Sequence, residues 1–290
     1  MTLTHRTARP SRRTALRHLA SGIGAVAVPA WAQTDQRRTA YSVAVVPQFP
    51  AAELHRDWTP LLERIGHQLG ISLTLKLAPS IPRFEAQLLE GQPDFAFLNP
   101  YHQVMASRAH GYLPLVRNGK PLTGILVVRK DSPIHSVREL AGTDIAFPSP
   151  NAFGASLWMR ALLAEREHIA FNALYVQTHG NVYRQVIRGR AAAGGGINNT
   201  LAQETPELRD DLRVLLETPE AASHPFSAHP RVAAALRRGI TDALLSLTSD
   251  PSGMTLLKNV ALPNPVAADH ARDYRPLEQY KLDKYVVIER

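Results

Sequence analysis

The sequence has no cysteine among its 290 residues. This absence excludes disulfide bonds, thiolate metal sites and a cysteine nucleophile, and it excludes an anchor that depends on a lipid-modified cysteine. Beyond its first residues the chain also lacks internal repeats, low-complexity segments and any apolar run of the roughly 20 residues that span a bilayer. What remains is an ordinary globular composition, 44% hydrophobic and 20% charged, with room for one or two domains.

The formal net charge of +8 suggests a nucleic-acid partner at first sight. However, residues 1–32 contain five arginines and no acidic residue. Without that segment the net charge falls from +8 to +3. The rest of the chain therefore gives no reason to expect a nucleic-acid partner.

This amino-terminal segment has the order of features that an export signal requires. A basic stretch, Ser11–Arg17, is followed by a moderately apolar stretch and by Ala30–Ala32, a small-x-small cleavage site before Gln33. The Arg12-Arg13 pair resembles a twin-arginine signal, but Ala15 stands where that signal usually has an aromatic residue or leucine, so the Tat and Sec routes both remain open. A disordered basic tail is the alternative. We expect cleavage at this site and a periplasmic location.

After a polar linker, short apolar runs alternate with amphipathic helical patterns. Such alternation predicts βαβ units, in which a mainly parallel sheet carries helices on its faces. The expected strands are Tyr41–Pro47, Ile71–Leu77, Asp94–Leu98, Tyr112–Arg117, Leu122–Lys130, Asp144–Phe147, Leu174–Thr178, Ala192–Ile197 and Leu212–Thr218. The expected helices are Asp57–Gly70, Arg83–Gly91, Tyr101–Gly111, Phe153–Glu167, Asn181–Gly189 and Asn199–Thr205, with a helical region from Pro230 onward.

Two of the extended runs, Leu122–Lys130 and Leu212–Thr218, stand where one α/β block gives way to the other. A chain that crosses twice inserts its second block into the first. We therefore expect a two-lobed α/β protein, with lobe one from residues 33–124 and 219–290 and lobe two from residues 125–218. Two lobes on a double hinge form a cleft that can close on a ligand.

Five segments follow one another in an informative order. They are LLEGQPDFAFLNPYHQVMA, VVRKDSPIHSVRELAGTDIAFPSPNAFGAS, VQTHGNVYRQVIRGRAAAGGGINNT, LLSLTSDPSGMTLLKNV and ADHARDYRPLE. Together they resemble the phosphate, phosphite and phosphonate substrate-binding proteins of ABC transporters, over nearly all of the chain after residue 32. The resemblance implies the two-lobed fold of a type II periplasmic binding protein. It also implies capture of a small oxyanion and its delivery to a membrane permease, without a cofactor.

The segment after the strand Asp144–Phe147 carries the main candidate for an anion site. Two prolines end the strand, and a helix is expected to begin with Asn151, Ala152, Phe153, Gly154, Ala155 and Ser156. The unpaired N–H groups and partial positive charge of a helix start can hold an anion, whereas close packing of the helix on its strand is the alternative explanation. The family usually offers several hydroxyls here. Ser156 is the only one in this segment, so the identity of the ligand stays open.

The carboxyl ends of strands in open α/β sheets converge on one crevice. The further residues expected there are Gln48, Phe49, Asn99, Pro100, Tyr101, His179, Asn181, Tyr183, Asn198 and Thr200. His179 can donate to an oxyanion and ordinarily titrates near neutral pH, although His179 and Asn99 can each simply cap a helix. The three glycines at 194–196 allow close approach of either a ligand or the facing helix.

Three functions remain open. No metal-ligand spacing and no nucleophile elbow stand out, so we predict neither a metal site nor an enzyme. A sensor that docks on a membrane histidine kinase would keep the fold but change the partner, and an exported enzyme would need an acid–base pair beyond His179. We favour the binding protein of an importer, acting as a monomer, and we expect the region from Asp273 to cap lobe one.

Overall fold

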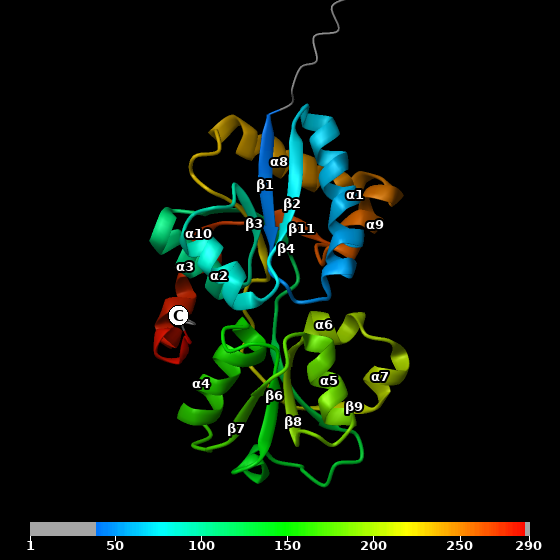
Figure 1. Ribbon diagram of the computed structural model, residues 1–290, viewed down its shortest axis with the longest axis vertical. Coiled ribbons are helices and arrows are strands. Elements are labelled where there is room, and N and C mark those ends of the chain that lie inside the picture. Colours follow the sequence, from blue (N-terminus) through cyan, green and yellow to red (C-terminus); the bar gives the residue numbers. More distant parts are fainter. Residues whose placement is uncertain (1–38, 288–290) are drawn as a thin grey trace, which may run out of the picture. The chain divides into compact units, whose positions relative to one another are not determined.

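The computed structural model describes residues 39–287, so the predicted export signal in residues 1–32 lies outside the described residues. The described chain forms two sheets, each flanked by helices (Figure 1). The strands of the first sheet, in spatial order, are β11 (Pro265–Ala267), β4 (Leu113–Asn118), β10 (Pro225–Ala228), β3 (Phe95–Phe97), β1 (Ala40–Val45) and β2 (Ser72–Leu77). Those of the second are β7 (Asn172–Tyr175), β6 (Asp144–Phe147), β8 (Ala193–Ile197), β5 (Gly124–Arg129) and β9 (Leu212–Glu217).

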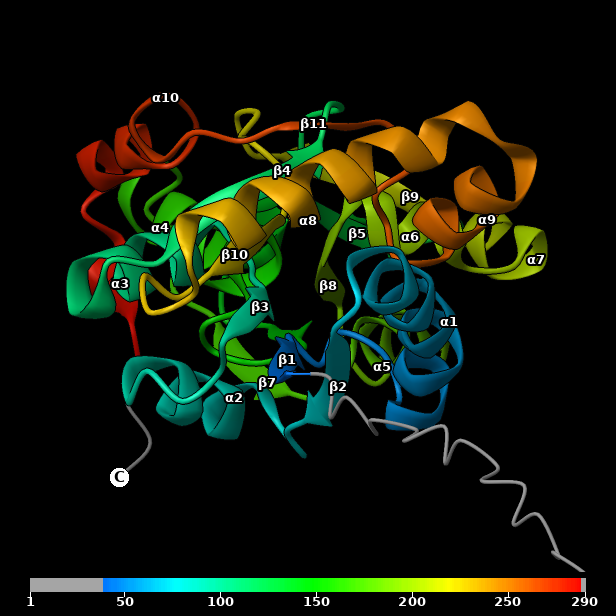
Figure 2. The same cartoon turned by 90° about the horizontal axis from the view of Figure 1, so that it is seen from above.

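We call each sheet, together with the helices packed on it, a lobe. The helices of lobe one are α1 (Ala51–Leu69), α2 (Ile81–Leu89), α3 (Pro100–His110), α8 (Ala234–Ser246), η3 (Leu247–Ser249), α9 (Pro251–Asn259), α10 (His270–Asp273) and η4 (Arg275–Tyr280). Those of lobe two are η1 (Val137–Leu140), η2 (Phe153–Leu157), α4 (Trp158–Glu165), α5 (His179–Ile187), α6 (Asn198–Gln203) and α7 (Pro206–Asp210). Figure 2 shows α8 lying across the first sheet, where it packs on β4 and β11. None of the described helices is both long and apolar enough to cross a membrane.

Both sheets are mixed, where the sequence predicted mainly parallel ones. The parallel part is β2-β1-β3 in lobe one and β7-β6-β8 in lobe two, as the βαβ pattern requires. The remaining neighbours pair antiparallel, because β4, β5, β9 and β10 belong to the segments that run from one lobe to the other and back. The two short strands β10 and β11 were not predicted, since each has only three or four residues and begins with a proline.

The long helix α1 begins at Ala51, well before the predicted Asp57. Its buried residues Leu54, Trp58, Leu61 and Ile65 recur at helical spacing, so the apolar face extends through the whole helix. The first turns are therefore held by packing on the sheet.

The two segments that pass between the lobes are hydrogen-bonded to each other. Leu122 and Ala221 exchange backbone hydrogen bonds of 2.8 and 2.9 Å. Next to them, Thr218 donates its N–H to Gly124 O at 2.8 Å, and Gly124 donates its N–H to Thr218 Oγ1 at 2.9 Å. The double crossing is thus a two-stranded ladder rather than two separate linkers.

The end of the chain touches lobe one, which the sequence predicted it to cap, and it also touches lobe two. We call residues 281–287, which include η5 (Leu282–Tyr285), the C-terminal strap. On lobe one, Tyr101 donates its hydroxyl to Asp283 at 2.5 Å. On lobe two, Arg160 donates to Tyr285 O at 2.8 Å, and Val287 donates its N–H to Asn151 Oδ1 at 2.9 Å. These long-range contacts add lobe two to the surface that the end of the chain covers.

Candidate functional site

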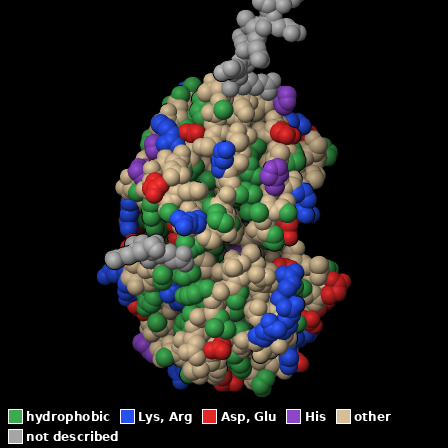
Figure 3. Space-filling view, viewed as in Figure 1, with side chains coloured by type: hydrophobic (Ala, Val, Ile, Leu, Met, Phe, Trp, Pro, Cys, Tyr) green, Lys and Arg blue, Asp and Glu red, His purple; other side chains and the backbone are tan. Residues whose placement is uncertain are grey.

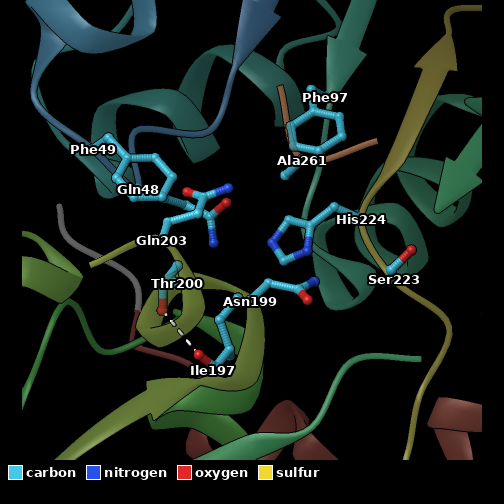
Figure 4. A pocket seen from close by; sticks show the side chains of 10 residues that line it. All are labelled: Gln48, Phe49, Phe97, Ile197, Asn199, Thr200, Gln203, Ser223, His224 and Ala261. Atoms are coloured by element: carbon cyan, nitrogen blue, oxygen red, sulfur yellow. Dashed lines mark hydrogen bonds between the residues drawn. The ribbon is translucent and has the colours of Figure 1, made fainter. Parts of the chain in front are cut away.

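Two small cavities lie where the strand ends of the two lobes meet. Each has a volume of about 10 Å³, which is room for about one water molecule. The first is lined by Gln48, Phe49, Phe97, Ile197, Asn199, Thr200, Gln203, Ser223, His224 and Ala261 (Figure 4). The second is lined by Val46, Gln48, Ile81, Asn99, Ala152, Phe153, Gly154, Ala155, His179, Ile197 and His224. Because three lining residues are common to both, we treat the cavities as neighbouring parts of one site.

Many of the predicted residues meet here. The predicted residues that line the two cavities are Gln48, Phe49, Asn99, Ala152, Phe153, Gly154, Ala155, His179 and Thr200. They come from loops after β1, β3, β6, β7 and β8, as expected from the convergence of strand ends. Two side chains of α6 that were not predicted, Asn199 and Gln203, face the same space as Gln48 and His224 (Figure 4).

A groove of about 810 Å³ continues from the first cavity toward the surface. It shares the residues Gln48, Phe49, Asn199 and Gln203 with that cavity. Charged side chains of both signs line only this outer part: Glu53, Arg56, Asp57, Arg184, Glu204 and Lys258. In Figure 3 basic side chains gather over α5 and the residues that follow it, where Arg184, Arg188 and Arg190 are exposed.

The helix after β6 begins with a turn of π-helix. Leu157 donates its N–H to Ala152 O at 3.0 Å, and Trp158 donates to Phe153 O, so that each bond spans five residues. The N–H groups of Phe153, Gly154 and Ala155 meet no backbone acceptor within residues 39–287, as is general at a helix start. The predicted anion-binding groups are therefore available, on a wider turn than an α-helix provides.

The ring of Phe153 belongs to the packing between the lobes and the end of the chain. It is only 2% exposed and lies 5.3 Å from Trp158, centroid to centroid. Trp158 in turn lies 4.6 Å from Tyr280 of η4. Phe153 thus lines the second cavity and also packs against Trp158.

Three successive glycines of β8 bring the sheet close to helices on both of its faces. A Cβ at Gly195 would overlap Ala155 O of η2, and one at Gly194 would lie 2.5 Å from Val182 of α5. A Cβ at Gly196 would overlap the Tyr183 hydroxyl of α5. Of the two explanations that the sequence left open, the structure favours packing against the facing helices.

His179 is the first residue of α5 and is almost completely buried. Its Nδ1 lies 3.2 Å from Thr200 Oγ1, which also lies 2.8 Å from the Tyr183 hydroxyl. Burial lowers the pKa of His179 to about 3, because the charged ring would lose its hydration. The ring is therefore neutral at pH 7, although a histidine ordinarily titrates near neutral pH.

His224 is a lining residue that sequence reasoning missed. It precedes β10, a strand too short to be predicted, so nothing indicated that it would be buried. Its ring stacks on Phe97 at 5.6 Å, and its Nε2 is enclosed without a hydrogen-bond partner in the described part of the chain. Burial, with smaller contributions from His102 and His179, lowers the pKa of His224 to about 3.

Several predicted site residues direct their side chains elsewhere. Asn151 donates to Glu85 and to Val287 O, both at 2.8 Å, and so joins α2 to the C-terminal strap. Tyr101 bonds Asp283 of the same strap, and the preceding Pro100 serves as the first residue of α3. These three residues were predicted to line the cleft, but Asn151 and Tyr101 bond the C-terminal strap instead.

The remaining predicted residues stabilise helices or the crossings. Ser156 Oγ accepts from Arg160 at 3.2 Å, Asn181 donates to Val176 O at 2.9 Å, and Asn198 donates to Pro121 O at 3.3 Å. Tyr183 lies behind Gly196 and reaches the site only through its bond to Thr200. None of these four lines either cavity, but Asn181 lines the groove that continues from the first one. Among residues 39–287 no group of three or more histidine or acidic side chains is placed to hold a metal ion.

A family model described as "ABC transporter, phosphonate, periplasmic substrate-binding protein" matches residues 43–274. A search of curated proteins gives no match.

Solved structures of low sequence identity share the fold. PhnD1 from Prochlorococcus marinus, in complex with methylphosphonate, has a TM-score of 0.76 at 16% identity, over 85% of this chain and 99% of that one. A binding protein component of an ABC phosphonate transporter from Pseudomonas aeruginosa has a TM-score of 0.74 at 15% identity, over 85% and 87%. XAC2383 from Xanthomonas citri, bound to chloride ion, has a TM-score of 0.70 at 20% identity, over 85% and 99%. The predicted fold of a two-lobed type II periplasmic binding protein is confirmed.

Proposed function

Because the chain belongs to the periplasmic substrate-binding proteins of phosphonate ABC transporters, we propose that it captures a small phosphonate-, phosphite- or phosphate-like oxyanion between its lobes. It then delivers this ligand to the permease of an ABC importer. The observation that carries the proposal is the start of η2. The N–H groups of Phe153, Gly154 and Ala155 meet no backbone acceptor, and these residues line the second cavity beside His179. An oxyanion accepts hydrogen bonds from such groups and is favoured by the partial positive charge of a helix start.

Ligand entry requires the lobes to separate. Each cavity holds about one water molecule, and a phosphonate is several times larger. The hydrogen-bonded crossings near Leu122 and Ala221 supply an axis for this movement. In this proposal residues 125–218 rotate as one body against residues 33–124 and 219–290, and the ligand stabilises the form in which it contacts both.

The same proposal includes export to the periplasm after cleavage before Gln33, and action as a monomer. A sensor function, in which the protein docks on a histidine kinase, has no specific observation in its favour. An enzymatic function has none either: in the part of the chain that the structure describes, no acidic side chain lines the cavities beside the two histidines of the site.

Thermal unfolding in the presence of candidate ligands tests the proposal. The panel contains methylphosphonate, phosphite, phosphate, arsenite, sulfate and small organic acids. A ligand present at 100 times its Kd stabilises the folded protein by about 2.7 kcal/mol, which raises the unfolding temperature by several degrees. Stabilisation by a phosphorus oxyanion, with micromolar or tighter affinity in calorimetry, supports the proposal. Stabilisation by an uncharged solute alone would overturn it.

A further inference from the structure

Thr200 determines which nitrogen of His179 carries the proton. Thr200 Oγ1 lies 3.0 Å from Ile197 O, 2.8 Å from the Tyr183 hydroxyl and 3.2 Å from His179 Nδ1. A carbonyl oxygen can only accept a hydrogen bond, so Thr200 donates its single hydroxyl proton to Ile197 O. Its two lone pairs are then left for a proton from Tyr183 and a proton from His179 Nδ1. All three contacts can be hydrogen bonds only in this arrangement.

The other nitrogen of His179 is consequently an acceptor. In a neutral imidazole one nitrogen carries hydrogen and the other a lone pair. With the proton on Nδ1, the lone pair is on Nε2, which has no protein partner within residues 39–287. The ring lines the second cavity, so this lone pair is available to a ligand there.

His224 adds a second neutral imidazole to the same space. It lines both cavities, and its enclosed Nε2 has no partner in the described chain. Buried polar atoms without a partner are rare and usually meet a ligand or an ordered water. With its proton on Nδ1, a neutral His224 offers the lone pair of this enclosed Nε2. The titratable groups that face the two rings are His102, which bonds Glu85, and Tyr183, which bonds Thr200.

Among residues 39–287, no lysine, arginine or acidic side chain lines either cavity. An anion there finds donors in the N–H groups at the start of η2 and in the amide of Gln48, and acceptors in the imidazoles. This set fits an oxyanion that has unprotonated oxygens for the donors and an O–H group for an acceptor. A fully ionised oxyanion has no proton to donate, so its oxygens would face imidazole lone pairs.

We infer that His224 contacts the ligand and that, together with His179, it makes the site select oxyanions that still carry an O–H group over fully ionised ones. At neutral pH a singly protonated phosphonate belongs to the first class and sulfate to the second. The inference rests on the proposed function, and it assigns to His224 a role in specificity that the sequence did not indicate.

Calorimetric titration of the purified protein with methylphosphonate and with sulfate, between pH 6 and pH 9, tests it. We expect methylphosphonate to bind at least tenfold more tightly than sulfate at pH 6. Its affinity should then fall by about tenfold per pH unit above the second pKa of the ligand, because the protonated form disappears. Sulfate binding should stay constant over the same range.

Variants separate His224 from the rest of the site. His224→Phe keeps an aromatic ring against Phe97 but removes both nitrogens, so methylphosphonate should bind about ten- to hundredfold more weakly, while sulfate changes less. His224→Gln restores an acceptor oxygen and should recover part of the preference. His67→Gln, on the exposed end of α1, should behave as the wild type. Thermal unfolding of each variant checks that it is folded.

The outcomes distinguish the two proposals. If the wild type binds no oxyanion, the proposed function fails and the inference with it. If the wild type binds methylphosphonate and sulfate equally, or binds methylphosphonate more tightly as pH rises, the inference fails while the proposed function stands. The inference also fails if folded His224→Phe keeps the wild-type ratio of the two affinities.

Discussion

The side-chain amide of Asn99, at the start of α3, donates a hydrogen bond of 3.2 Å to the backbone carbonyl of Asn151, which precedes η2 in the other lobe. The Oδ1 atom of Asn99 meanwhile accepts the N–H of His102 at 2.7 Å and so caps α3. One side chain therefore stabilises a helix with its oxygen and joins the two lobes with its nitrogen.

The two functions of Asn99 can be separated by substitution. Asn99→Ser keeps an oxygen that can cap α3 but loses the bond to Asn151, whereas Asn99→Ala loses both. We expect the alanine variant to be about 1 kcal/mol less stable than the serine variant, because that is the usual contribution of a cap. Denaturant unfolding measures this difference. Equal stability of the two variants would show that the cap contributes nothing.

We expect Tyr101 to stabilise the C-terminal strap and to make no contact with the ligand. Tyr101→Phe removes the hydroxyl that Asp283 accepts and leaves the buried ring in place. We expect a loss of about 0.5–1.5 kcal/mol in stability and faster amide hydrogen exchange in residues 281–287. Affinity for methylphosphonate should not fall below that of the wild type, and it should rise if the weakened strap lets the lobes separate more readily. A tenfold loss of affinity would place Tyr101 at the ligand after all, as the sequence predicted.

Protonation of the buried histidines should destabilise the fold in acid. The pKa of His179 and that of His224 are each about 3 in the folded protein, against about 6.5 in the unfolded chain. Between these values the unfolded state binds more protons, so stability is complete above pH 6.5 and falls as pH falls toward 3. Each ring contributes about 1.4 kcal/mol per pH unit in that window. Denaturant unfolding from pH 7 to pH 4.5 should show a shallower loss in His224→Phe, and an unchanged slope would contradict this account.

Gly195 is expected to tolerate no side chain. Gly195→Ala places a Cβ on Ala155 O and 2.6 Å from the ring of Phe147, so η2 has to move away from β8. We expect a loss of about 1–3 kcal/mol in stability, typical of overpacking, together with weaker ligand binding. Gly239→Ala, in α8, meets only the flexible end of Leu69 at 3.3 Å and serves as the control. It should be neutral or stabilising, because alanine favours helix.

The architecture could be predicted because it depends on local periodicity. Apolar runs and amphipathic patterns repeat along the chain, and strand ends converge by a general rule. That rule brought Gln48, Asn99, Gly154 and His179 to one place. The π-turn at η2 could not be predicted, since it depends on how the carbonyls of Gly154 and Ala155 fit against glycines of two distant strands.

The side chains that lie away from the cavities have a common physical cause for their placement. Tyr101 and Asn151 do follow strands, as predicted, but the C-terminal strap comes from the opposite end of the sequence and bonds both of them. Neither periodicity nor spacing carries information about such a contact. His224 was missed for a similar reason, because the strand that buries it is short and pairs with β3 and β4 from far away in the chain.

The C-terminal strap gives the two lobes a third attachment. The two crossings are hydrogen-bonded to each other, so the proposed movement of the lobes has a single hinge. The strap lies away from that hinge, next to α3 and α4 (Figure 1), so a wide separation of the lobes has to break its contacts. In the proposed movement we therefore expect the strap to act as a latch. We expect the strength of the latch to set the resting fraction of molecules that are open to a ligand, with an apparent Kd that scales inversely with that fraction. Residues at the far end of the chain can thus tune the concentration range in which the protein responds, without touching what it binds.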